Sequence, residues 1–376
     1  MKVSIRDLSK MTGFSPATIS NALNHKKGVN KDTAEEIFRI ARETGYLSAN
    51  AVTKIRLVIF KKNGRIIEDT PFFQSLIEGF EEECRRLGYE MVVSRADQRN
   101  PEYLNQVREM LSEQGAAVVV LATEMMDGDL EPYRNAPCPL VILDYWTESM
   151  EFNAVLINNA DAARMMTEHL LDNGHKEVGY LRGSFRIKGF RSRFVGFQTA
   201  LKKRKVPYKE EYTVTLGTSL NSAYQDMLEY LKTSPKLPTA FFADNDMIAL
   251  GAMKALREMG YRIPEDVSVA GFDDLPFSEI STPALTTLRV PNREMGKMAV
   301  RRISEMIEGI GTDAVIKTQV CPKIVYRLIQ ISGYFFAENS VISCVGILKI
   351  HMCLFIFVYI NVYITIAEKY DLNRKI

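Results

Sequence analysis

Features that would indicate an exported, metal-binding or membrane-embedded protein are scarce in this chain of 376 residues. The five cysteines are scattered and form no CxxC pair, so neither a disulfide framework nor a thiolate zinc site is indicated. The four histidines have no metal-ligand spacing to one another. The N-terminus alternates charged with apolar residues, whereas a cleaved leader needs an uninterrupted apolar stretch. We therefore expect a cytoplasmic protein without a bound metal.

The short motifs of common enzyme classes are also missing. No GxGxxG follows an apolar run of strand length and no GxxxxGK[ST] occurs, so the loop that cradles the phosphates of a nucleotide is not indicated. The sequence contains no nucleophile elbow. We expect a protein that is not an enzyme and uses no cofactor, with an α/β enzyme as a weaker alternative.

Charge is nearly balanced over the whole chain but not along it. There are 48 Lys and Arg against 46 Asp and Glu, yet residues 1–56 carry ten basic and five acidic side chains. This excess marks the N-terminal end as the candidate binder of a polyanion. On charge alone a solvated basic helical face is an equal alternative, because the excess is modest. The length predicts two or three domains.

Residues 1–47 have the pattern of three short helices. Gly13 is placed to end the first helix, Ser15 and Pro16 suit the N-cap and first position of the second, and Asn30 and Gly45 bound the third. Three helices in so short a segment form the minimal core of a helix-turn-helix domain. The apolar residues at helical spacing, expected to face inward, are Ile5, Leu8, Met11, Ile19, Ala22, Leu23, Ala34, Ile37, Ile40 and Ala41.

A combined string distinguishes this segment from a generic three-helix bundle. Ile5-Arg6-Asp7-Leu8, Gly13-Phe14-Ser15, Thr18-Ile19-Ser20, Leu23-Asn24, Val29-Asn30, Thr33 and Gly45-Tyr46 resemble the head of the lactose-repressor and galactose-repressor (LacI/GalR) family of bacterial transcription regulators. The resemblance implies that the second helix enters the major groove, where Asn21 can pair with adenine and Thr18 and Asn24 hold phosphates. The expected DNA-binding residues are Ser15, Pro16, Ala17, Thr18, Ser20, Asn21 and Asn24.

From residue 55 the pattern changes to alternating strands and helices, which predicts parallel sheets covered on both faces. The fold class is therefore α/β, with the helical head followed by a body over residues 55–327. Two such series resemble the two-lobed periplasmic sugar-binding-protein architecture, which is also the body of the LacI/GalR family. The predicted strands are 56–60, 90–94, 117–121, 140–143, 154–157, 177–181, 239–243 and 267–270, and the predicted helices are 73–87, 102–111, 161–173, 193–203, 224–231 and 245–260.

Ligand-binding candidates lie at strand ends and match motifs of that family. Arg193 lies in an Arg-x-x-Gly-aromatic motif, and Asn245 and Asp273 follow strands of the second lobe. A guanidinium, an amide and carboxylates can bind adjacent sugar hydroxyls. Asp246 and Asp274 are better explained as helix caps or supporting residues, and Trp146 either stacks on a sugar or covers the seam between lobes. The expected ligand-binding residues are Phe72, Asp161, Arg193, Asn245 and Asp273.

Two stretches depart from the family pattern. Residues 48–54 form a shortened hinge, in which Ser48 and Ala49 stand at the Pro-Asn places and Ile55 falls where the leucine wedge belongs, although a strand begins there. Residues 328–376 form a hydrophobic extension, which we interpret as an out-of-frame or read-through tail; a membrane anchor and an extra packed element are the alternatives.

These patterns predict a homodimeric transcription regulator, most simply a repressor, that binds a DNA operator. A small sugar-like effector held between the two lobes would control its operator affinity, with no membrane contact unless the extension is an anchor. The alternative is a cytosolic sugar-binding sensor without direct DNA function. The sequence identifies neither the effector nor the operator.

Overall fold

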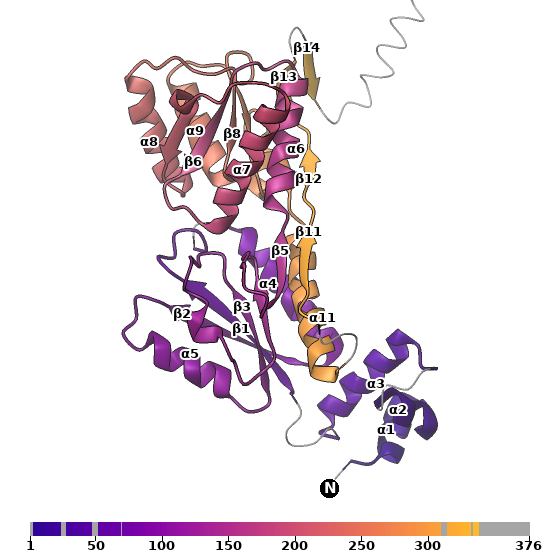
Figure 1. Ribbon diagram of the computed structural model, residues 1–376. Helices are drawn as coiled ribbons and strands as arrows, with labels where there is room; N and C mark the ends of the chain where they lie inside the picture. The colour runs from indigo at the N-terminus through magenta and orange to yellow at the C-terminus, as the bar shows by residue number, and fades with distance from the viewer. Residues whose placement is uncertain are drawn as a thin grey trace, which may run out of the picture.

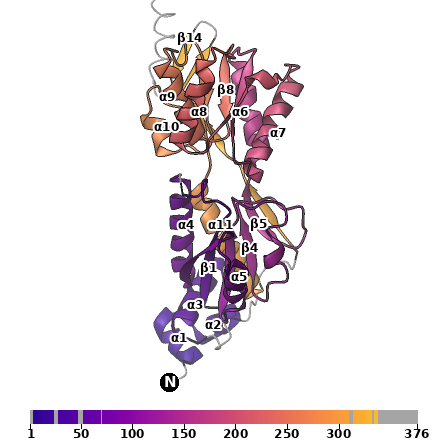
Figure 2. The same ribbon diagram turned by 90° about the vertical axis from the view of Figure 1, so that its left-hand side faces the viewer.

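The computed structural model describes residues 3–23, 28–46, 52–68, 70–309, 314–331 and 334–337. It consists of a small helical head and an α/β body whose two lobes are stacked end to end (Figure 1). The head lies against the lobe that begins at β1, which is called the N-lobe here, and the C-lobe is at the far end (Figure 2). The predicted fold class is confirmed.

Three helices form the head: α1 (Ile5–Thr12), α2 (Pro16–Leu23) and α3 (Lys31–Glu43). Gly13 ends α1 in the left-handed conformation at φ 75°. The Ser15 hydroxyl accepts a hydrogen bond from the Thr18 amide at 3.1 Å, and the Asn30 side chain accepts one from the Thr33 amide at 2.7 Å. These caps satisfy backbone donors that the first helical turn leaves unpaired.

The head has its own small core, which contains Leu8, Ile19, Ile37 and Ala41. These residues come from all three helices, so the predicted inward faces meet as expected. Met11 is the exception, with 57% of its surface exposed. The last turn of α1 carries it away from the other two helices.

A six-stranded parallel sheet forms the N-lobe, in the order β11-β5-β4-β3-β1-β2. Helices α4 (Phe72–Leu87) and α11 (Asn292–Glu308) pack together on one face, and α5 (Tyr103–Ser112) covers the other with the short helix η1 (Glu131–Tyr133). Its strands are β1 (Lys54–Lys61), β2 (Glu90–Asp97), β3 (Ala116–Leu121), β4 (Leu140–Leu143), β5 (Asn153–Ile157) and β11 (Lys317–Val320).

The C-lobe repeats this plan with a four-stranded parallel sheet in the order β7-β6-β8-β9. Its strands are β6 (Val178–Gly183), β7 (Thr213–Leu216), β8 (Ala240–Ala243) and β9 (Ser268–Ala270). Its helices are α6 (Asn159–Asp172), α7 (Lys188–Lys203), η2 (Glu210–Tyr212), α8 (Leu220–Lys232), α9 (Asp246–Glu258) and α10 (Pro276–Ile280).

The chain passes between the lobes three times. It leaves the N-lobe after β5, returns after β10 (Thr287–Arg289) into α11, and leaves again between β11 and β12 (Lys323–Val325), which pairs with β10. The N-lobe is therefore completed by residues 292–320, far from its beginning in the sequence.

The predicted first strand is confirmed, although it begins two residues earlier than expected, at Lys54. Ile55 is paired on both sides within the sheet and has no exposed surface, so it is a core residue here and not a DNA wedge. Residues 48–51 of the predicted hinge lie outside the described residues. Of the predicted extension, β13 (Leu328–Ile331) and β14 (Tyr334–Ala337) form an antiparallel hairpin.

Every helix in the part of the chain that the structure describes is too short or too polar to cross a bilayer. The apolar run over residues 341–366, on which the anchor alternative rests, lies outside that part.

Candidate functional site

The first candidate surface is the exposed N-terminal turn of α2. Ser15, Pro16 and Ala17 are exposed there, while Ile19 and Ala22 turn inward to the head core. Thr18, Ser20 and Asn21 are half-buried. An exposed helix start is the part of a helix-turn-helix that reaches base edges in the major groove. Asn24 lies outside the described residues.

The hydroxyls of Ser15 and Thr18 have a structural role as well. They lie 2.8 Å apart, and Ser15 caps the helix through the Thr18 amide. A phosphate oxygen placed at this helix start would meet the same donors, since helix N-termini favour anions. The expected DNA-binding residues that the structure describes therefore all lie at the N-cap and in the first two turns of α2.

The second candidate site lies between the two lobes, where strand ends from both sheets meet. Asp144 follows β4 and Thr123 follows β3 in the N-lobe, while Asn245 follows β8 and Asp273 follows β9 in the C-lobe. This is the edge at which open α/β sheets bind ligands. The enclosed space is about 30 Å³, room for a water molecule or two. A sugar therefore requires the lobes to move apart.

Arg193, on α7, is the only cation among the residues that line this space. Its side chain is almost fully buried and lies over the Phe272 ring, with Cζ 3.6 Å from the ring centroid. Nε donates to Asn159 Oδ1 at 2.8 Å and Nη1 donates to the Asp244 carbonyl oxygen. Nη2 lies 3.5 Å from Asp273 Oδ1, an ion pair longer than a direct charge-assisted hydrogen bond.

Two carboxylates, the half-buried Asp144 and the buried Asp273, face this cation from opposite lobes. Burial raises the pKa of Asp144 to about 6, although the Thr123 hydroxyl, 2.6 Å away, and Arg193 act in the other direction. Burial also raises the pKa of Asp273 well above its usual value, against the attraction of Arg193. With two acids and one guanidinium, the site offers both hydrogen-bond acceptors and donors to ligand hydroxyls and has no surplus of cations to bind an anion.

The backbone at both acids is in the left-handed region, with φ 61° at Asp144 and φ 116° at Asp273. Such conformations are uncommon for residues other than glycine, although aspartate tolerates them better than most. Strained backbone held by the surrounding structure clusters at binding sites, and here it directs both carboxylates into the cleft.

Asp161 does not belong to this site. It lies in the first turn of α6, which is part of the C-lobe, and 66% of its side chain is exposed. Its carboxylate accepts from Asn158 Nδ2 at 3.0 Å and pairs with Arg164. The expectation that Asp161 reaches the ligand from the other lobe is therefore wrong, because its own helix start uses it. Asp144 takes that place.

Phe72 and Asn245, two further predicted residues, border the same cleft. Phe72 lines the cleft beside Phe73, with ring centroids 5.1 Å apart in an edge-to-face arrangement. The side-chain oxygen of Asn245 caps α9 by accepting from the Ile248 amide at 3.0 Å, so a ligand would meet its amide NH₂. Asp246 supports the site from within the C-lobe. Its carboxylate accepts hydrogen bonds from the Ser278 and Thr287 hydroxyls and from the Leu275 amide.

A buried glutamate, which the sequence patterns do not single out, holds one wall of the cleft. Glu124 has no exposed surface, and its Oε2 accepts from the amides of Lys62, Asn63 and Gly64 at 2.8–3.0 Å. Its Oε1 accepts from the amide of Ile66, which lines the cleft. One sequence signal could have identified Glu124: it is a carboxylate three positions after the apolar strand β3.

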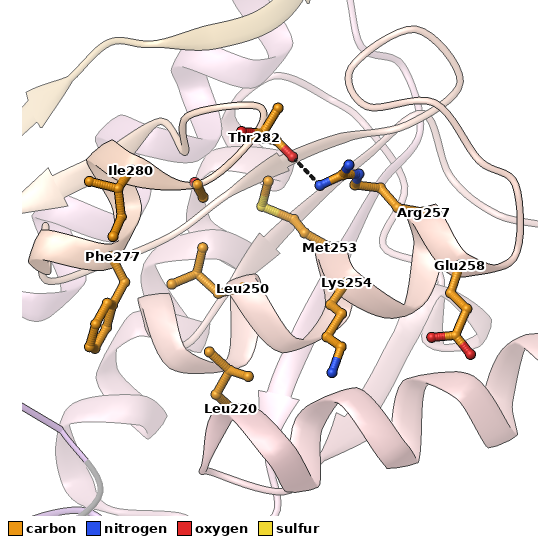
Figure 3. Close-up of a pocket in the computed structure, with 10 residues that line it drawn as sticks. Leu220, Leu250, Met253, Lys254, Arg257, Glu258, Phe277, Ile280 and Thr282 are labelled. Carbon is orange, nitrogen blue, oxygen red and sulfur yellow. Dashed lines mark hydrogen bonds between the residues drawn. The ribbon is translucent and has the colours of Figure 1, made fainter.

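The C-lobe also has an apolar hollow on its outer surface, between α8, α9 and α10 (Figure 3). Its volume is about 530 Å³, and Ile280 beside it is 76% exposed. Arg257 donates to the Thr282 carbonyl oxygen at its edge, at 2.6 Å. Exposed apolar surface of this kind is a candidate interaction surface. The apolar residues that line it are Leu220, Leu250, Met253, Phe277 and Ile280.

Trp146 lies outside the cleft. It is half-exposed, and the Lys317 ammonium lies 4.9 Å from the centre of its ring. Its position favours neither stacking on a ligand nor closure of the cleft seam.

Comparison with known proteins gives consistent results. Residues 167–328 match the family described as periplasmic binding protein-like domain. The curated HTH-type transcriptional repressor PurR of Mannheimia succiniciproducens is 30% identical over 328 residues, covering 86% of this chain and 97% of the relative. The PurR repressor of Haemophilus influenzae strain PittEE is 29% identical over 329 residues, with the same coverage.

Solved structures show the same fold. A transcriptional regulator CelR–cellobiose complex superposes with a TM-score of 0.66 at 23% identity, covering 86% of this chain and 99% of that one. The lac repressor dimer bound to operator and the anti-inducer ONPF superposes with a TM-score of 0.63 at 22% identity, covering 87% and 98%.

Proposed function

This chain belongs to the LacI/GalR family of transcription regulators, and we propose that it is a cytoplasmic, homodimeric repressor whose operator affinity is set by a neutral, polyhydroxylated effector. It acts by binding and not by turnover. The relatives named above are repressors, and solved neighbours carry cellobiose or ribose. On this proposal the helical head is a DNA-binding unit and the two lobes form one effector-binding unit.

The convergence of Arg193 with Asp144 and Asp273 carries the effector part of the proposal. These three charged groups come from opposite lobes and all line one cleft. Hydroxyl groups can donate to both acids and accept from the guanidinium at the same time. A phosphorylated or carboxylated sugar would bring an anion next to two carboxylates, so the arrangement favours a neutral sugar over an anionic one.

The dimer part rests on the apolar hollow of the C-lobe. A second copy placed across α8, α9 and α10 would cover Phe277 and Ile280, which are otherwise exposed to water. A two-fold dimer would also present two heads to the two halves of a palindromic operator.

Selection of binding sites from random duplexes, with and without a panel of neutral sugars, tests both parts. We expect a palindromic site, and a shift in its affinity with one class of sugar. Failure to enrich any duplex would contradict the DNA-binding function. Calorimetry with the same panel, and with phosphorylated counterparts, would then test the effector class separately.

A further inference from the structure

Helix α3 of the head carries a buried arginine whose contacts are with the N-lobe. Arg42 is 6% exposed, and its Nε and Nη2 both donate to the Leu87 carbonyl oxygen, at 3.0 and 2.6 Å. Its Nη1 donates to Tyr89 Oη at 2.9 Å and to Glu308 Oε1 at 3.0 Å. A guanidinium without such partners would not be buried, because burying an unpaired charge is costly.

The surroundings of Arg42 are built for this contact. The guanidinium lies 4.0 Å from the centre of the Tyr89 ring, and Tyr89 Oη lies 3.1 Å from Ser304 Oγ. Gly88, which ends α4 at φ 74°, lies against the backbone of α3: a Cβ atom there would come within 2.9 Å of Arg39 Cα. A side chain at Gly88 would therefore push the head away.

We propose that this cluster, the head latch, fixes the DNA-binding head to the N-lobe of its own chain and does the work of a hinge. The head latch consists of Arg42, Leu87, Tyr89, Ser304 and Glu308. Its partners lie at the carboxyl ends of α4 and α11, so the head is docked on the ends of these two helices (Figure 1).

The same two helices begin at the ligand cleft. Phe72, the first residue of α4, lines the cleft, and its carbonyl oxygen accepts from Asn292 Nδ2 of α11 at 2.9 Å. Both helices then run in the same direction to the head latch, over roughly 25 Å at 1.5 Å per residue. One end of the pair therefore meets the effector and the other end holds the head.

The pair is stiff because its backbones touch. A Cβ at Gly79 of α4 would lie 2.0 Å from the Arg293 carbonyl oxygen, and one at Gly296 of α11 would lie 2.1 Å from the Leu76 carbonyl oxygen. Arg301 of α11 further pairs with Glu83 of α4 at 2.6 Å. Movement of the N-lobe about the cleft is thus passed to the head as movement of one rigid body.

The DNA consequence, which rests on the proposed function, is a fixed distance between the two heads of a dimer. Each base pair inserted between half-sites shifts them by about 3.4 Å and rotates them by roughly 35°. A head on a free linker can move and rotate with its half-site, whereas a head held by the head latch cannot.

Hydrogen exchange of the full chain tests the head latch without DNA. Arg42→Ala should speed exchange of amides at 84–89 and 38–45 by about tenfold or more, since hydrogen bonds to charged groups are the stronger ones. The control Arg85→Ala removes the same charge from an exposed side chain of α4 and should leave exchange unchanged. Unchanged exchange in Arg42→Ala overturns the proposal.

If Arg42→Ala also exposes α1 and α2, Tyr89→Phe decides, because it alters the head latch from the body side and leaves the head sequence intact. Faster exchange confined to α3 and the ends of α4 and α11 supports the head latch, and no change contradicts it.

A spacer series on the selected operator tests the consequence. The wild-type chain should lose about tenfold or more in affinity when one base pair is inserted or removed at the centre, while Arg42→Ala should stay within about twofold. Superimposable profiles would overturn the role of the head latch in DNA spacing. If the wild type selects no duplex at all, the proposed function fails, and the exchange experiment still decides whether the head latch exists.

Discussion

Two buried arginines, Arg42 and Arg193, have nearly the same contacts but different surroundings. Each lies over an aromatic ring, each donates to a backbone carbonyl oxygen, and each faces a carboxylate. Arg42 pairs with Glu308 at 3.0 Å, whereas Arg193 lies 3.5 Å from Asp273, with Asp144 opposite.

The difference lies in the balance of charge. The guanidinium of Arg42 is fully engaged, in a cluster that joins two parts of the chain. Around Arg193 the acids are in excess, and burial raises the pKa values of Asp144 and Asp273. A buried arginine with matched partners holds a joint, while one among surplus acids marks a place where a ligand supplies the missing donors.

The contrast between the two arginines depends on Ile55 being part of the body, within strand β1. Ile55→Ala tests this with the largest expected effect. Removing a fully buried strand side chain should lower the free energy of unfolding by about 2–5 kcal/mol, measured by urea denaturation. Val93→Ala, at a half-exposed apolar residue of the neighbouring strand β2, is the control. A mutant of unchanged stability that binds its operator weakly would instead identify Ile55 as a DNA wedge.

Arg193→Ala should weaken effector binding by about 1.5–3 kcal/mol, because ligand hydroxyls lose a charged donor. Operator affinity without effector should survive, since the hydrogen bonds and ion pair of Arg193 reach Asn159, Asp244 and Asp273 and not the head, α4 or α11. Calorimetry provides the measurement. The matched control Arg204→Ala removes an arginine at the far end of α7, and equal affinity in both variants would remove Arg193 from the site.

Asp144→Asn should remove a pH dependence of the free energy of unfolding that comes from the acid facing Arg193. The pKa of Asp144 is raised to about 6 in the folded chain from 3.8, so the folded state binds the proton more tightly. Its contribution to stability is present below pH 4 and is lost as the pH rises from about 4 to 6. The variant should therefore gain about 1–3 kcal/mol over the wild type above pH 6.

Asparagine suits that position, because it also tolerates the left-handed backbone and can accept from Thr123. Urea unfolding of both proteins at pH 4 and pH 7.5 measures the effect. A difference between the two proteins that is the same at both pH values would show that the pKa of Asp144 is not shifted by folding.

Asn21→Ala should have the smallest effect, because this half-buried side chain acts on DNA and not on the fold. Loss of a bidentate pair with adenine relaxes preference at one base pair per half-site by about 1–3 kcal/mol. Stability and effector affinity should not change. A binding-site selection that returns the wild-type preference would exclude Asn21 from base recognition.

The two arginines also show what a sequence reveals. Arg193 could be predicted because it lies in a local motif beside strand ends, where topology brings residues together. Arg42 could not, because its partners are 45, 47 and 266 residues away and lie on the ends of other helices. The head helices were predictable from caps and spacing, which act within a few residues.

Two further differences have the same origin. Asp161 was misplaced because an aspartate at a helix start looks alike whether it caps the helix or faces a ligand. Strands β7, β10, β11 and β12 and helix α11 were not predicted. These strands have three or four residues; β10 pairs with β12, and β11 joins a sheet whose other strands lie far earlier in the chain. Short edge elements of this kind depend on tertiary pairing more than on their own pattern.

The three crossings of the chain have a consequence during synthesis. A ribosome releases the head first and most of the N-lobe soon after, yet α11 and β11 emerge only once residues 292–320 have been made. Until then α4 lacks the helix that covers it, and the docking place of the head lacks Ser304 and Glu308. Premature termination anywhere in the C-lobe would thus release a polypeptide with a finished DNA-binding head and an exposed, aggregation-prone sheet face.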